Sequence, residues 1–173
     1  MCSIDAFNID LKGLNAEQTV LRFVLDDAYF EAIEAPDVKK GQLECVLDIH
    51  KTDTFFELNF HTEGVVQIPC DLCLDEMDQP ILSDDRLIVK FGEEYSEEDD
   101  LVIVDENEGM LDVSWFIYEF IVLNIPIKHV HAPGNCNAAM MKLLDEHTVT
   151  RSDGQDKEKA IDPRWSKLAE LLD

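Results

Sequence analysis

Apolar and polar residues alternate along most of the first hundred residues of the chain. A period of two is typical of β-strands that bury one face and leave the other wet. The alternation predicts strands at residues 7–11, 21–25, 43–49, 56–60, 66–68 and 87–91. Glu63-Gly64 lies between two of these runs and predicts a tight hairpin turn. Residues 26–33, just before Pro36, predict a short helix.

The period changes in the last third of the chain. Large apolar residues fill positions 113–123 and predict a buried helix, with Asp112 as its N-cap and Pro126 beyond its end. Glu119 is the one charge in this helix. It is either a carboxylate on an exposed stripe or a buried acid bonded to a backbone donor or to a ligand histidine. Asn137 predicts the cap of a second helix that ends near residue 146.

These elements predict an α+β fold. An antiparallel sheet, open or barrel-like, from the N-terminal two thirds is packed by the buried helix, and residues 1–147 form one domain. Residues 148–160 are polar and predict a flexible linker. Residues 161–173 predict a C-terminal helix, because Asp162-Pro163 is a typical start and the large apolar residues after it share one face.

Charge narrows the classes of partner. The 173 residues include 14 Lys and Arg against 38 Asp and Glu, a formal net charge of −24. Residues 128–173 hold seven basic and eight acidic residues, so that residues 1–127 carry −23. Such a body repels phosphate backbones and attracts basic partners. The densest run, residues 93–108, has nine carboxylates and no Lys or Arg. It is either a solvated loop or a docking surface for a basic protein.

The sequence also bears on the compartment. No apolar run reaches the roughly 18 residues of a membrane span. The first residues, Met1-Cys2-Ser3-Ile4-Asp5, do not have the pattern of a signal peptide. Five cysteines is an odd number, and free thiols are typical of the cytosol. We therefore expect a cytoplasmic protein with no membrane partner.

Cysteine and histidine residues supply the candidate chemistry. Two cysteines separated by two residues, Cys70 and Cys73, can bind one zinc ion from a tight turn, and His131 with Cys136 would complete a tetrahedron. His129 is the alternative third ligand. The long gap between the pairs would make the metal join the sheet to the helical region, which is typical of a structural site. The alternative interpretation is partly buried free thiols and surface histidines.

The two remaining cysteines do not fit this pattern. Cys45 lies on the apolar face of a predicted strand, and Cys2 is in the terminus. A thioredoxin-like redox pair needs a βαβ setting, whereas Cys70 and Cys73 follow the predicted hairpin at Glu63-Gly64.

Three segments in the correct order resemble one family. Residues 68–75 are similar to its Cys-x-x-Cys-Leu-Glu segment. Residues 119–136 are similar to its apolar helix with a glutamate, its Leu-Pro step and its later His/Cys-to-Cys spacing. Asp162-Pro163-Arg164-Trp165, with Leu168, resembles its C-terminal helix. The chain, from about residue 40, thus resembles the YceD family, the large ribosomal RNA subunit accumulation proteins.

The resemblance implies a ligand set. Many relatives have proline where this chain has His129, which favours His131 as the shared ligand. Many relatives also carry a Lys-Gly-Leu-Cys end to the second motif, whereas Asn137-Ala138 follows Cys136 here. The set of four that remains is Cys70, Cys73, His131 and Cys136, with zinc as the metal.

The resemblance further implies a part in accumulation or processing of large-subunit ribosomal RNA, in bacterial cytoplasm or plastids, without a known catalytic activity. Combined with the charge, it predicts docking of a basic ribosomal or ribosome-assembly protein. RNA contact would be local, within residues 128–164, at Lys128, His129, Lys142, Arg151, Lys157, Lys159 and Arg164. The alternatives are a zinc-dependent hydrolase or nuclease acting on RNA and an interaction module without a metal.

Overall fold

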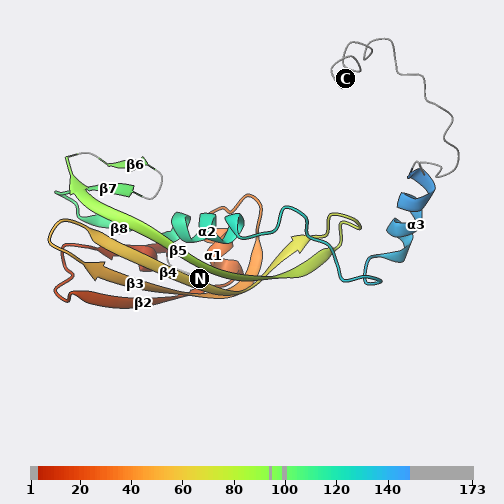
Figure 1. Cartoon of the computed structure of the whole chain (residues 1–173), viewed down its shortest axis with the longest axis horizontal. Coiled ribbons are helices and arrows are strands. Elements are labelled where there is room, and N and C mark those ends of the chain that lie inside the picture. Colours follow the sequence, from red (N-terminus) through yellow and green to blue (C-terminus); the bar gives the residue numbers. More distant parts are fainter. Residues whose placement is uncertain (1–3, 94, 99–100, 149–173) are drawn as a thin grey trace, which may run out of the picture. The chain divides into compact units, whose positions relative to one another are not determined.

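The computed structural model describes residues 4–93, 95–98 and 101–148 (Figure 1). The chain divides into two compact units, which are residues 1–141 and residues 142–173. The predicted linker and the predicted C-terminal helix lie outside the described residues, Thr148 excepted. The described part contains no helix that is both long enough and apolar enough to cross a membrane.

A six-stranded sheet is the centre of this α+β fold, in the order β2-β3-β4-β5-β7-β6. Its neighbours pair antiparallel except β5 and β7, which are parallel. The strands are β2 (Gln18–Leu25), β3 (Lys40–Lys51), β4 (Phe56–Pro69), β5 (Glu76–Gly92), β6 (Ser96–Glu98) and β7 (Leu101–Asp105). A two-stranded sheet pairs β1 (Asn8–Asp10), which follows the short 3-10 helix Ile4–Phe7, with β8 (Met110–Asp112).

The sheet is open, so the expectation of a barrel-like sheet is wrong. The outer strands, β2 and β6, do not pair with each other in the described sheet. Helices cover the core instead of a closed ring of strands. These are α1 (Asp27–Ala32) and α2 (Ser114–Leu123), which lie on the same side of the sheet in Figure 1.

The expected hairpin turn at Glu63-Gly64 is also wrong. Strand β4 runs without a break through both residues, and the inward positions on either side, Thr62 and Val66, are both fully buried. Gly64 has φ +148°, and a Cβ there would lie 2.3 Å from the Gln42 carbonyl oxygen on β3. Glycine is therefore required because the backbone of β3 approaches closely, not because the chain reverses.

Helix α2 closes the core over β4. It buries Phe116, Ile117 and Ile121, and the Phe120 ring lies 5.2 Å from the Phe60 ring, centroid to centroid. The Tyr29 hydroxyl of α1 donates a 2.7 Å hydrogen bond to the Ser114 carbonyl of α2. This bond joins the two helices over one core.

The helix starts follow the sequence closely. Asp26 caps α1 as its carboxylate accepts a hydrogen bond from the Tyr29 amide. Asn137 caps α3 (Ala138–His147), accepting bonds from the amides of the second and third helical residues. The cap of α2 is Val113 rather than the predicted Asp112. The Asp112 carboxylate nevertheless accepts a 2.8 Å hydrogen bond from the Ser114 amide.

The described part of the acidic run contains two strands. Residues 93–108 contain β6 and β7, and β7 pairs with the end of β5. The alternation of Val102 and Val104 into the core makes β7 a strand despite the surrounding carboxylates. The interpretation as a solvated loop is therefore wrong for β6 and β7.

A substitution at Gly64 tests the close approach of β3. Gly64→Ala is expected to lower the free energy of unfolding by about 2–3 kcal/mol, since the new methyl group meets the β3 backbone. Urea denaturation measures the loss. The control is Gly13→Ala, whose Cβ meets only the flexible Asp10 side chain at under 3 Å. An equal effect of the two substitutions would contradict the explanation.

Candidate metal centre

The turn of the β4–β5 hairpin carries the Cys-x-x-Cys pair. Pro69 pairs with Glu76, and the six residues between them form the turn. The Cys70 amide donates to the Asp75 carbonyl, and the Leu74 amide donates to the Cys70 carbonyl, both at 2.9 Å. Leu74 has φ +63°, in the left-handed region. The pair thus lies in the hairpin turn itself, whereas the sequence placed it after an earlier hairpin.

Backbone donors also surround the first sulfur. The Leu72 amide donates to Cys70 Sγ at 3.5 Å. Although burial raises the pKa of the Cys70 thiol, hydrogen bonds from backbone amides, that of Cys73 first, lower it to about 6. The turn therefore favours a thiolate at Cys70, the form of cysteine that binds metals.

The segment after α2 is held against this turn by a reciprocal contact. The Asp71 amide donates to the His129 carbonyl at 2.9 Å. In return, the His129 amide donates to the Asp71 carboxylate at 2.8 Å. The His129 ring also lies beside that carboxylate, with Nε2 3.4 Å from Oδ1. Further along the segment, the Asn137 side-chain amide donates to the Asp75 carboxylate at 3.1 Å.

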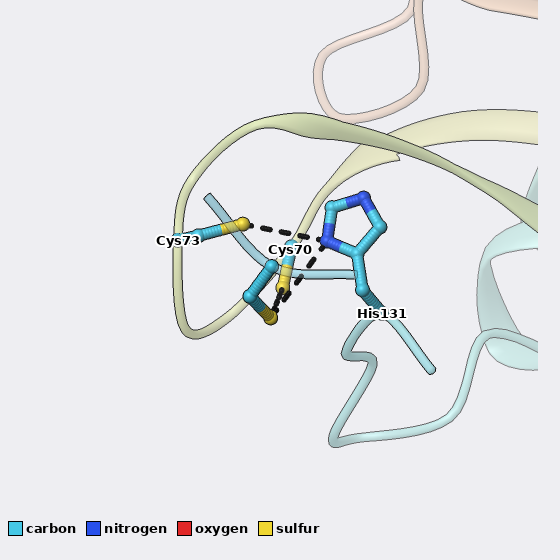
Figure 2. A group of neighbouring side chains, drawn as sticks. Cys70, Cys73 and His131 are labelled. Atoms are coloured by element: carbon cyan, nitrogen blue, oxygen red, sulfur yellow. Dashed lines mark hydrogen bonds between the residues drawn. The ribbon is translucent and has the colours of Figure 1, made fainter. Parts of the chain in front are cut away.

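These contacts bring the four predicted ligands together. One ligand atom from each of Cys70, Cys73, His131 and Cys136 lies within 4.8 Å of all the others. The Cys73 sulfur is 3.3 Å from His131 Nδ1, and the Cys136 sulfur is 3.9 Å from that of Cys70 and 4.0 Å from His131 Nδ1. Figure 2 shows Cys70, Cys73 and His131 pointing toward one another.

The separations are close to those of a tetrahedral site. Zinc bonds of about 2.3 Å to sulfur and about 2.0 Å to nitrogen place ligand atoms about 3.5–3.8 Å apart. Cys70 and Cys73 are buried, and His131 and Cys136 are half-buried. Burial, together with the neighbouring thiols of Cys70 and Cys73, raises the pKa of Cys136 to about 11. Three thiols this close cannot all ionise without a cation among them.

The structure separates the other candidates from the cluster. His129 Nδ1 lies 3.0 Å from the Pro126 carbonyl oxygen, so its ring is engaged outside the cluster. The half-buried Glu119 carboxylate accepts a 2.8 Å hydrogen bond from the Trp115 indole nitrogen rather than from a ligand histidine. Cys45 is buried in β3, and burial raises its pKa to about 11. Cys2 lies outside the described residues.

Sequence reasoning missed Asp71 and Asp75 as positioning residues. Both carboxylates receive donors from the second ligand segment. An aspartate inside a turn is ordinary, and its partner more than fifty residues away leaves no local signal.

A family comparison covers this region. The family model described as Large ribosomal RNA subunit accumulation protein YceD matches residues 58–172, about two thirds of the chain. The chain belongs to the YceD family. All four clustered residues lie inside the match, which begins within β4. The family description concerns accumulation of large-subunit ribosomal RNA and states no enzymatic reaction.

The other two comparisons returned nothing. No curated protein matches the chain, and no solved structure does. Family membership therefore rests on the family model.

Removing the Asp71 carboxylate tests how the second segment is held. Asp71→Ala is expected to destabilise the protein by about 1 kcal/mol, because a half-exposed charged acceptor is lost. Amide exchange at His129 should become faster, which hydrogen-exchange mass spectrometry detects. The control is Asp78→Ala, which removes a carboxylate bonded to Gln67 at 3.4 Å. Unchanged exchange at His129 in Asp71→Ala would contradict the assigned contact.

Proposed function

We propose that this YceD protein is a non-catalytic accessory protein that supports accumulation of large-subunit ribosomal RNA. In this proposal it binds a basic ribosomal or ribosome-assembly protein in the cytoplasm, and Cys70, Cys73, His131 and Cys136 hold a structural zinc ion. The observation that carries the zinc proposal is the convergence of three sulfurs and one imidazole nitrogen within 4.8 Å.

The donor set fits zinc. Thiolate and imidazole ligands are the common protein ligands of structural zinc sites, and four of them close the coordination sphere. Two ligands come from the β4–β5 turn and two from the segment between α2 and α3. A zinc ion bound to all four would fasten the hairpin tip to that segment. Its contribution would be to stability, because the ligand groups come together only in the folded chain.

The alternative of a zinc-dependent hydrolase or nuclease finds less support. A catalytic zinc ion normally has three protein ligands and keeps one position for water. The cluster offers four ligands. A hydrolase would also need a general acid or base near the metal, and the Glu119 carboxylate is instead bonded to Trp115. An interaction module without a metal is the third candidate, and metal analysis separates it from the other two.

The charge supports a basic protein as the partner. A net charge of −24 disfavours broad contacts with phosphates. Among the basic residues proposed for local RNA contact, Lys142 pairs with Glu146 at 3.9 Å, and the His129 ring contacts Asp71. Arg151, Lys157, Lys159 and Arg164 lie outside the described residues.

Metal content tests the zinc proposal. The purified full chain is expected to contain one zinc ion, and a chelator should lower Tm by about 10 °C or more, as expected for a loss of several kcal/mol in a protein of this size. Cys73→Ser should lose both the zinc and the response to the chelator, whereas Cys45→Ala should keep both. A zinc-free wild type whose Tm ignores the chelator would favour the metal-free module. A chelated protein that stays equally stable but loses RNA cleavage would favour the hydrolase.

Affinity capture tests the partner. The tagged protein is recovered from cells with and without nuclease, and co-purified proteins are identified by mass spectrometry. We expect a basic ribosomal or assembly protein to remain after nuclease treatment, because the contact is between proteins. Recovery of RNA without any such protein would contradict the proposed partner.

A further inference from the structure

One face of the main sheet is uncovered. Helices α1 and α2 pack on the inward-facing side chains of β2–β5, and no element among the described residues covers the outward-facing ones. We call these outward-facing positions of β2–β5 the free face. A sheet face in water normally carries few large apolar side chains. Here Val20, Val24 and Leu82 are 53–68% exposed.

One row across the free face has an unusual composition. The register places Val24, Glu44, Glu63 and Leu82 side by side on four successive strands. Two carboxylates therefore face each other across β3 and β4, with an exposed apolar side chain at each end. Like charges directly opposite each other destabilise a sheet. A partner that places cations beside the two carboxylates and apolar groups beside the two ends would therefore stabilise the row.

Two basic side chains next to this row already have acidic partners. Arg22 bonds Glu44 at 2.7 Å, and His61 lies 2.7 Å from Asp84. Glu63 has no ion-pair partner among the residues that the structure describes. Its negative charge is therefore open to a cation from outside.

A hollow of about 790 Å³ adjoins this row. Gln42 and Val65, the next outward residues on β3 and β4, line it together with three carboxylates, Asp26, Asp27 and Asp78. Gly41 also lines the hollow, and a Cβ there would lie 2.9 Å from the Val65 carbonyl oxygen on β4. The hollow gives room for a long basic side chain beside these carboxylates, with Val65 as an apolar contact.

We propose that the free face docks a basic polypeptide segment with interspersed apolar side chains. Its apolar residues would contact Val24 and Leu82, and its Lys or Arg side chains would reach Glu63 and the hollow. The inference rests on the proposed basic partner and locates its binding on the free face rather than on the acidic run at residues 93–108. RNA is disfavoured here because its phosphates would meet carboxylates.

The test is a calorimetric titration of the full chain with a synthetic 18-residue peptide, whose leucine and lysine residues are arranged as an amphipathic helix. The measured quantity is the affinity for this peptide. Glu63→Lys combined with Asp78→Lys should weaken binding at least tenfold. The matched control, Glu93→Lys combined with Glu97→Lys, changes net charge equally within the acidic run and should alter binding less than threefold. Leu82→Ser should weaken binding at unchanged charge, because it removes an apolar contact.

The outcomes distinguish this inference from the proposed function. Equal or greater weakening in the acidic-run control would overturn docking on the free face, while a basic protein retained in the affinity capture would still support the proposed function. No binding of the peptide to the wild type would also overturn the inference. So would binding of an RNA duplex whose affinity rises no more with the Glu63 and Asp78 substitutions than with the control substitutions.

A readout without peptide checks the repulsion in the row. Glu63→Gln should raise the urea midpoint of unfolding, because it removes one of two facing carboxylates. Glu93→Gln is the control and should leave the midpoint unchanged. A lower midpoint in Glu63→Gln would show that Glu63 is satisfied in the free protein and would contradict the open charge on which docking depends.

Discussion

The unbroken pairing of β4 with β5 determines where everything else in this protein lies. The ladder runs from Phe56 opposite Val89 to Pro69 opposite Glu76. At one end it presents Phe60 to α2, and at the other it ends in the turn that carries two cysteines. Gly64 allows β4 to continue unbroken beside β3, because any side chain there would clash with the β3 backbone. A chain reversal at Gly64 would have placed the cysteines on another strand edge.

The metal centre depends on a second constraint, the contact between Asp71 and His129. Two ligands come from a turn that local hydrogen bonds shape, and two come from a segment that reaches the turn only after α2 has packed. In an unfolded chain the two halves are separated by more than fifty residues. Closing that loop has an entropic cost, which core packing and the reciprocal hydrogen bonds offset. Folding therefore assembles the ligands, and a bound ion would in turn stabilise the folded state.

Features with a local cause could be predicted from the sequence. Alternation identified β2, β3, both ends of β4 and the last part of β5, and the cap residue Asn137 identified the start of α3. The short helix expected at residues 26–33 corresponds to α1. The spacing of Cys70, Cys73, His131 and Cys136 indicated residues that the structure brings together. Features with a distant cause were missed. Glycine is suited both to a turn and to a close approach of two strands, so the prediction of a turn at Gly64 was wrong. The parallel pairing of β7 with β5 has no signal in the sequence of either strand.

The two proposed sites share a hairpin but rest on different physics. Gln67 and Asp78, which line the hollow, pair with each other only two registers before the turn. Inward-facing residues of the same strands belong to the core, so each strand presents buried apolar groups to one side and carboxylates to the other. The cluster would act through bonds to a buried ion, which salt screens little, whereas the free face would act through exposed charges, which salt screens strongly. Raising ionic strength should therefore separate them, because it weakens docking while a bound metal ion stays in place.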